Sequence, residues 1–345
     1  MIRGYTIEHL LIRFPDDDSV LEAIMRNTAD ADGRRHCPSC LAPRYFKRIA
    51  TRKCYQCCRC GHQHYPLAGT VMAGTKLPLS KWLRAVHLFY THRSGVSAQM
   101  LQREVEVTFK VAWRMAHQIR RLMADETTTP LHGTMEADET YVGGRKRADS
   151  RRSVPKKTAV FGLLERGGRV RTCAVQHVNK PTLYTLIREN VASGTPVHSD
   201  EHSLDTKLPE EGYPYQSVLH KAYEWKRGEV STNGIEGHWS RVKRTVRGAY
   251  VSVSPQWLQF YLNESSFQHN RRQQSYLIVE DLLARLMHPL PASSRKGPPG
   301  LVPTPAGAEA GAGPNNAFRP RPTRSSHSSS GQSSPLACWS CRNCS

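Results

Sequence analysis

Three acidic residues in this strongly basic chain have the type and spacing to bind divalent cations. Asp138 lies in TMEADETYVGG, Asp200 in TPVHSDEH and Glu236 in NGIEGHWSRVKR, and the formal net charge of the whole chain is +20. Carboxylate oxygens are the ligands that Mg²⁺ prefers, and two such ions can activate an oxygen for attack on a phosphodiester. The positive net charge suggests a nucleic-acid partner, and carboxylates near phosphates weaken nucleic-acid binding. Acidic residues kept in a nucleic-acid-binding surface therefore indicate a metal site.

The segment around the first two acids alternates between predicted strands and helices. Asp138 ends the first predicted strand, and GRKRADSRRSVPKK after it is expected to be a mobile basic loop over DNA. Gly167-Gly168 is typical of a hairpin turn, and Asn179-Lys-Pro181 starts a helix well. The order β, β-hairpin, α, β, β, α is that of an α/β ribonuclease-H-like domain with a mixed sheet, in which Asp138 and Asp200 would meet at adjacent strand ends. The elements after the first strand are strands 158–164 and 170–178, helix 183–191, and strands 196–200 and 213–219.

Glu236 lies on a predicted helix whose faces can be counted. One stripe is apolar and would pack on the sheet, which turns the adjacent polar stripe with Glu236, Lys243 and Arg247 toward the two aspartates. An alternative stays open, because Asn233-x-x-Glu236 also fits a capping box that would use Glu236 only to begin the helix. His238 is expected at the surface or facing DNA. The nearby acids Glu136, Glu139 and Glu201 are interpreted as ordinary solvated side chains.

These strings carry a resemblance to a known family. DETYVGG, SDE and NGIEGHWSRVKR, with paired cysteines upstream, resemble the bacterial insertion-sequence DDE transposases with an N-terminal zinc ribbon, members of the ribonuclease-H-like integrase superfamily. The resemblance covers roughly residues 8–280. It implies Asp138 as the ligand that bridges two Mg²⁺ ions, for which Mn²⁺ could substitute, with Asp200 on one ion and Glu236 on the other. It also implies cleavage and strand transfer at terminal inverted repeats into target DNA, by a homo-oligomer, without a Ser, Cys or Tyr nucleophile.

Six of the ten cysteines lie between Cys37 and Cys60. Two C-x2-C pairs at this separation have the spacing of a four-cysteine structural zinc ribbon, and clustering in a cytosolic chain favours metal over disulfides. The expected zinc ligands are Cys37, Cys40, Cys57 and Cys60. Cys54 and Cys58 could substitute among them, His62 and His64 are also within reach, and reduced thiols without metal are the remaining alternative.

Between Ser80 and Met123 the apolar spacing becomes helical and predicts three short helices. Ser80, Ser97 and Thr108 are the expected caps, and the arrangement is typical of a helix-turn-helix. A plain three-helix packing unit with a solvated charged face remains the alternative. On the third helix, the polar residues that could face a DNA groove are Lys110, Arg114, His117, Gln118 and Arg121.

The two ends of the sequence and its composition limit the cellular location and the partners that we expect. The N-terminus lacks a signal peptide and no apolar run approaches about 18 residues, so we expect a cytoplasmic, nucleoid-associated bacterial protein without a membrane or small-molecule partner. Pro, Ser, Gly and Ala dominate the segment 289–345, which predicts a disordered tail whose three cysteines are a weak metal signal. The full prediction is a multidomain protein with a lead-in (1–35), zinc ribbon (36–68), helix-turn-helix (75–126), catalytic domain (130–288) and tail. The rival hypotheses are a catalytically silent DNA-binding regulator and a nuclease of the same fold without strand transfer.

Overall fold

The computed structural model describes residues 5–27, 36–41, 46–125, 127, 129–143, 157–200, 208–218, 228 and 230–290. Residues 144–156 of the predicted basic loop, the predicted tail beyond Leu290 and the competing acid Glu201 lie outside these residues. Within the described ranges, no helix combines the length and the hydropathy that crossing a bilayer requires.

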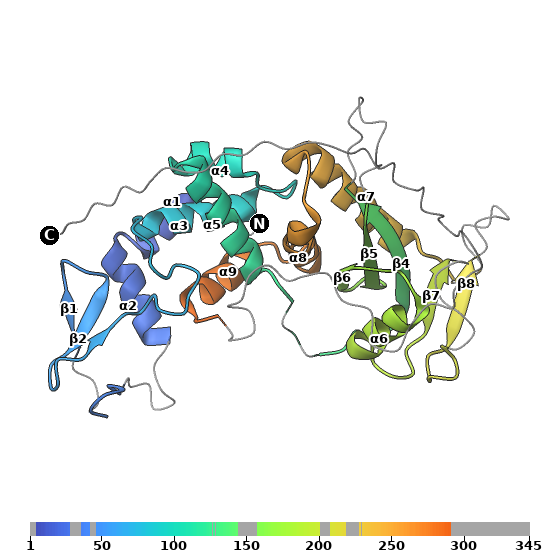
Figure 1. The fold of residues 1–345 in the computed structure, drawn as a ribbon, viewed down its shortest axis with the longest axis horizontal. Coiled ribbons are helices and arrows are strands. Elements are labelled where there is room, and N and C mark those ends of the chain that lie inside the picture. Colours follow the sequence, from blue (N-terminus) through green and yellow to red (C-terminus); the bar gives the residue numbers. More distant parts are fainter. Residues whose placement is uncertain are drawn as a thin grey trace, which may run out of the picture. The chain divides into compact units, whose positions relative to one another are not determined.

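Six helices share the first hydrophobic core. Five come from the N-terminal third, and α9 joins them from the far end of the described chain (Figure 1). Phe267 of α8 also contributes to this core. The segment predicted to be the catalytic domain, residues 130–288, therefore ends in a helix that packs with the N-terminal helices. The six are α1 (Ile7–Arg13), α2 (Asp17–Asn27), α3 (Leu79–Thr91), α4 (Ala98–Val105), α5 (Phe109–Leu122) and α9 (Leu277–Met287).

The three predicted helices of this region are present, but only one cap is formed as expected. Ser97 caps α4, because its side chain accepts a hydrogen bond from the backbone N–H of Met100 at 3.1 Å. The prediction for Ser80 was wrong, since α3 begins at Leu79. The carboxylate of Asp17 accepts from the Leu79 N–H at 2.6 Å, so a side chain 62 residues away supplies the cap. Thr108 occupies the N-cap position of α5 without a capping side-chain bond.

A small three-stranded antiparallel sheet follows the first cysteine pair. Its order is β1-β2-β3, with β1 at Phe46–Ile49, β2 at Cys54–Cys57 and β3 at Gln63–His64. The sheet contains few apolar side chains, so little hydrophobic burial holds it together.

The larger sheet has five strands in the order β6-β5-β4-β7-β8 and is mixed, as the sequence predicts. The pairs β4/β5 and β5/β6 are antiparallel, whereas β4/β7 and β7/β8 are parallel. The first strand was expected to end at Asp138 but continues to Val142, because Thr140 and Val142 still pair with Val160 and Thr158. The strands are β4 (Met135–Val142), β5 (Thr158–Glu165), β6 (Val170–Val175), β7 (Val197–Asp200) and β8 (Tyr215–Val218).

Separate apolar cores cover the two faces of this sheet. Helix α6 (Lys180–Asn190) packs on one face. On the other face lie α7 (Asn233–Thr245), the π-helical turn η2 (Val246–Tyr250) and α8 (Leu258–Asn270). Gly162 of β5 admits the indole of Trp239, since a Cβ at Gly162 would lie 2.4 Å from the Trp239 ring. Helix α7 therefore approaches the sheet closely beside Asp138.

Strand β6 forms one edge of the sheet, and side chains of α8 occupy its free hydrogen-bonding groups. The Gln259 amide accepts from the Ala174 N–H at 2.8 Å and donates to the Thr172 carbonyl at 2.9 Å. Asn270 makes the same two kinds of bond with the backbone of Val170, at 2.8 and 3.1 Å. Two amide side chains thus replace a neighbouring strand.

A buried polar cluster ties α5 to α8 and η2. Arg120, only 1% exposed, donates to Glu264 Oε2 at 2.7 Å and to the Val96 carbonyl at 2.6 Å. Tyr250 donates to the same Glu264 oxygen at 2.7 Å. Because breaking a buried ion pair leaves an uncompensated charge, this cluster fixes the packing of α5 against α8.

Candidate active site

The first two predicted acids come together on neighbouring strands. Glu136 of β4 is paired with His198 of β7, so Asp138 and Asp200, each two residues further along parallel strands, lie side by side. Asp138, Glu139 and Asp200 each offer a carboxylate oxygen within 4.8 Å of the others. This spacing allows one divalent cation to contact several of these oxygens.

Glu236 lies near this group on the first turn of α7 without being within 4.8 Å of all three acids. Its Oε1 accepts a hydrogen bond from the Thr232 hydroxyl at 3.0 Å, and its charge acts on Asp138. The capping box with Asn233 does not form, because Asn233 is already the first helical residue and the residue at the N-cap position, Thr232, makes no capping side-chain bond. The structure therefore brings all three predicted acids into one region.

Burial and the neighbouring carboxylates raise the pKa of Asp138. Burial, then the charges of Asp200 and Glu236, raise its pKa to about 6, against the lowering effect of hydrogen bonds from the Glu139 N–H and the Trp239 indole. Those two bonds measure 2.8 and 3.0 Å. Like charges crowded at a half-buried position favour the neutral acid, and a bound cation would reverse this preference.

Two of the acids interpreted as solvated have structural neighbours instead. Glu136 is 2% exposed; its Oε2 accepts from the Ile235 N–H at 3.0 Å, and Arg166 donates to its Oε1 at 3.2 Å. The carboxylate thus satisfies a donor at the N-terminus of α7 and fixes where that helix begins. Glu139 is half-buried and belongs to the acid group. Side chains alternate between the two faces of a strand, so Glu136 lies on the same face of β4 as Asp138. This alternation could have shown from the sequence that Glu136 lies beside α7.

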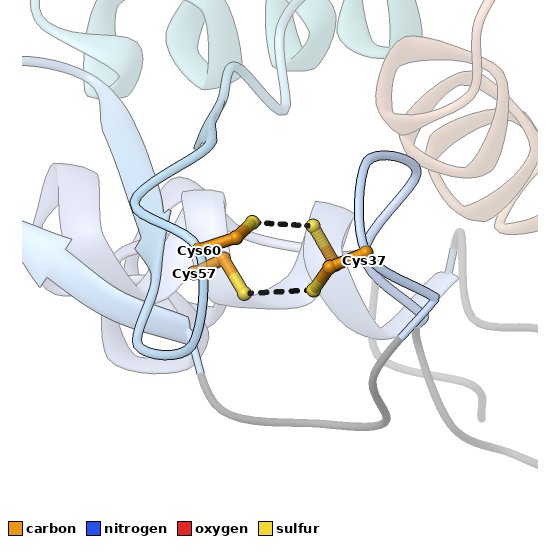
Figure 2. A group of neighbouring side chains, drawn as sticks. Cys37, Cys57 and Cys60 are labelled. Atoms are coloured by element: carbon orange, nitrogen blue, oxygen red, sulfur yellow. Dashed lines mark hydrogen bonds between the residues drawn. The ribbon is translucent and has the colours of Figure 1, made fainter.

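The four cysteines expected to bind zinc are gathered in one group. The sulfurs of Cys37 and Cys60 are 3.6 Å apart (Figure 2). Those of Cys40 and Cys57 are 3.8 Å apart. These separations are far too long for disulfides but fit the edges of a tetrahedron around zinc, about 3.8 Å for Zn–S bonds of about 2.3 Å. Backbone N–H groups of Cys60 and Arg59 lower the pKa of Cys57 to about 7, which favours the thiolate. Cys54 and Cys58 lie outside the group.

The side chains predicted to face DNA are only partly where the sequence placed them. On α5, Lys110 and Arg114 are exposed, and Gln118 and Arg121 are half-buried. His117 was predicted to face a groove, but it is 5% exposed because its ring packs against Trp113 and Trp257, with centroids 4.0 and 4.7 Å away.

His238 was also predicted incorrectly. It is fully buried, because α8 covers the side of α7 that helical periodicity assigns to solvent, and its ring contacts His269 at a centroid distance of 5.3 Å. Burial, with neighbouring His269 and Arg241, lowers its pKa to about 3, so this imidazole is neutral at physiological pH.

A basic groove lies beside the end of β4. It has a volume of about 810 Å³, and Lys243 of α7 and Arg247 of η2 line it together with Tyr141 and Lys157. The two cations predicted to share a face with Glu236 therefore border a space next to the strand that carries Asp138. Phosphate groups are the natural ligands of such a surface.

Comparisons with known proteins agree with this arrangement. Residues 130–270, which include the five-stranded sheet, α7 and α8, match the family model of the ISXO2-like transposase domain. A protein described as an uncharacterized protein in transposable element ISH50 of Halobacterium salinarum is 26% identical over 273 residues, covering 72% of this chain and 91% of the relative. Residues 130–270 are thus similar to the ISXO2-like transposase domain, and most of the chain is similar to a protein of a transposable element.

Proposed function

We propose that this protein is a DDE transposase that binds the terminal inverted repeats of its insertion sequence and catalyses metal-dependent cleavage and strand transfer into target DNA. The single observation that carries the proposal is the meeting of Asp138 and Asp200 on adjacent parallel strands, with Glu236 close enough to raise the Asp138 pKa. A carboxylate group of this kind inside a chain of net charge +20 has no evident use in simple DNA binding.

The strand order supports a ribonuclease-H-like fold for this domain. In chain order the five strands are numbered one to five, and their spatial order is 3-2-1-4-5 with only the second antiparallel to the rest. Helix α6 connects the third strand to the fourth, and α7 follows the fifth. The central strand β4 carries Asp138, and its neighbour β7 carries Asp200.

The residues fit a pair of Mg²⁺ ions, or Mn²⁺ in their place. Asp138, Asp200 and Glu236 would supply the oxygen ligands, and Glu139 offers a further oxygen in the same group. Bound ions would lower the pKa of the attacking oxygen and neutralise charge that builds up on the phosphate.

The chain's own side chains have definable tasks around this site. Trp239 and the Glu139 N–H orient the Asp138 carboxylate, and Glu136 fixes the start of the helix that carries Glu236. Lys243 and Arg247 would hold the phosphates of the reacting strand in the adjoining groove. In-line displacement at a phosphodiester depends mainly on such positioning and charge stabilisation.

The N-terminal third would provide recognition. Cys37, Cys40, Cys57 and Cys60 would bind structural zinc and leave no open position for a reacting water. Helices α3 to α5 would act as a helix-turn-helix, with Lys110, Arg114, Gln118 and Arg121 of α5 toward the terminal repeat. Homo-oligomerisation on DNA would follow from the need to cut two ends together, at the bacterial nucleoid.

An end-joining assay tests the proposal. Labelled duplexes that end in the terminal repeat are mixed with a target plasmid, with Mg²⁺ present or chelated. Wild type should nick the duplex and join its ends to the plasmid only with Mg²⁺, whereas Asp138→Asn should bind the repeat with unchanged affinity and do neither. Glu189→Gln, at an exposed position of α6, is the matched control and should keep full activity.

The same assay separates the rivals. Nicking without joining would indicate a nuclease of the same fold without strand transfer. Binding without Mg²⁺-dependent nicking by wild type would indicate a catalytically silent regulator. Full cleavage by Asp138→Asn would remove that residue from the site and refute the proposal.

A further inference from the structure

A second, smaller pocket is lined by cationic and polar side chains and is separate from the acid group. It has a volume of about 190 Å³ and lies where the loop between α3 and α4 meets the outer side of α7 and the end of α8. The α3–α4 loop contributes Arg93 and α7 contributes Arg241. The lining side chains that could donate hydrogen bonds to a ligand include Arg93, Arg241, Arg272, Ser265, Gln268 and Ser275.

The positive charge of this pocket is not balanced by the described carboxylates. Glu264 is the one acid among the described lining residues, and its oxygens already accept from Arg120, Tyr250 and the Val96 N–H. None of the three lining arginines forms an ion pair with a described carboxylate. Arg272 donates only to the backbone carbonyls of Gly167, Gly168 and His269, at 2.9 to 3.0 Å. Three guanidinium groups therefore border a small space without a counter-charge in the described part of the chain.

The crowding of positive charge around the pocket changes the pKa values of the side chains there. Arg241 donates to Nδ1 of His269 at 2.5 Å. Burial and then Arg272 lower the pKa of Arg241, and burial, Arg272 and Arg241 together lower that of His269 to about 4. Beside His269 lies the fully buried His238, neither of whose ring nitrogens has a hydrogen-bond partner among the described residues. Buried polar groups without partners are rare, and here they adjoin the uncompensated arginines.

We propose that this pocket binds a phosphate group. Guanidinium groups form forked hydrogen bonds that match phosphate oxygens, and serine and glutamine side chains can donate to the oxygens that remain. An anion would offset the repulsion among the arginines, whereas a cation or an apolar ligand would not.

The backbone of bound DNA is the favoured source of this phosphate, a choice that rests on the proposed function. Arg93 precedes α4 and α5, the helices proposed to contact the repeat, whereas Arg241 belongs to the same helix as Glu236. One phosphate held between them would contact the recognition helices and the transposase domain at once. A free phosphate compound is the other source of the same chemistry.

The first arm of the test uses inorganic phosphate and requires no DNA. Thermal unfolding of the full-length, zinc-loaded protein is measured without added Mg²⁺, in phosphate and in chloride at equal ionic strength. Wild type should be stabilised as a saturating function of phosphate concentration. Arg93→Gln and Arg241→Gln should each weaken this response roughly ten- to hundredfold, the effect of one lost charge-assisted hydrogen bond. Arg93 is exposed and has no described partner, so its replacement removes no internal contact.

The control is Arg84→Gln, which removes the same charge from an exposed position on α3 outside the pocket. The second arm measures the salt dependence of affinity for a terminal-repeat duplex. Loss of a DNA phosphate contact in Arg93→Gln or Arg241→Gln should lower the slope by about one. Arg188→Gln, at an exposed position of α6 outside both the pocket and helices α3 to α5, should leave the slope unchanged.

The two arms identify the occupant. A weakened phosphate response with a lowered slope supports a DNA backbone phosphate, and a weakened response with an unchanged slope supports a free phosphate compound. If both pocket variants respond to phosphate as Arg84→Gln does, the proposal is overturned. Because the first arm needs neither DNA binding nor cleavage, this outcome is distinct from failure of the proposed transposase activity.

Discussion

Replacing Asp138 by Asn should stabilise the metal-free protein at neutral pH. The folded state holds the Asp138 proton up to a pH of about 6, whereas an unfolded chain releases it near the ordinary value of 3.8. Between these values the folded state binds more protons, so stability falls as the pH rises, and the loss is complete above about 6. A difference of about two pKa units corresponds to about 3 kcal/mol.

Asparagine at position 138 cannot carry a charge, so it removes this loss of stability, and it keeps most of the hydrogen bonds of the aspartate. Its amide oxygen can still accept from the Trp239 indole, which lies 3.0 Å from the native carboxylate. At neutral pH without added Mg²⁺, the gain in the free energy of unfolding should approach the roughly 3 kcal/mol derived from the pKa difference, and it should shrink toward zero below pH 4. Added Mg²⁺ should stabilise wild type more than the variant, because binding to the folded state alone raises stability.

Urea denaturation of both proteins at several pH values measures this gain. Asp125→Asn is the control of opposite sign: burial raises the pKa of Asp125, but hydrogen bonds from Thr127 and Arg171 lower it overall. That variant should lose stability at neutral pH and lose less near pH 3. An Asp138→Asn protein that is less stable than wild type at neutral pH, by an amount that does not change with pH, would refute the electrostatic argument for the acid group.

Two further predictions concern the supports of these sites. Elemental analysis of the purified protein should find one zinc ion per chain. Cys40→Ser should lose this zinc and become protease-sensitive between residues 36 and 68, whereas Cys58→Ser, outside the group, should retain it. Retention of zinc by Cys40→Ser would contradict the ligand set. Gly162→Ala should destabilise the protein by about 1–3 kcal/mol and reduce cleavage, because the new methyl would lie 2.4 Å from the Trp239 ring and displace it from Asp138. Gly237→Ala, which has open space around it on α7, should instead be neutral or stabilising by up to about 1 kcal/mol. Equal urea midpoints for the two glycine variants would show that the contact of Trp239 with β5 is unimportant.

The acid group was largely predictable from sequence because it depends on strand order. Alternating apolar patterns and turn residues identified the strands, and the pairing of the first strand with the fourth brought Asp138 to Asp200. The cysteine group was predictable for a similar reason, since C-x2-C spacing is a local property.

Side-chain roles that depend on packing between distant segments were not predictable. Helical periodicity detects one buried stripe, but α5 and α7 are each covered on a second side by residues near or within α8, which buries His117 and His238. The Trp239 bond to Asp138 depends on the absence of a side chain at Gly162, on another strand. The cap that Asp17 supplies to α3 crosses 62 residues and leaves no local signal.

The amide side chains along β6 limit how copies of this chain can associate. Gln259 and Asn270 already occupy the backbone groups of Val170, Thr172 and Ala174 that an incoming strand would need. A second copy could not continue the sheet across this border without first detaching α8 from it. If subunits pair as proposed, their contacts would use side-chain surfaces along that border, and the sheet of each subunit should stay five strands wide there.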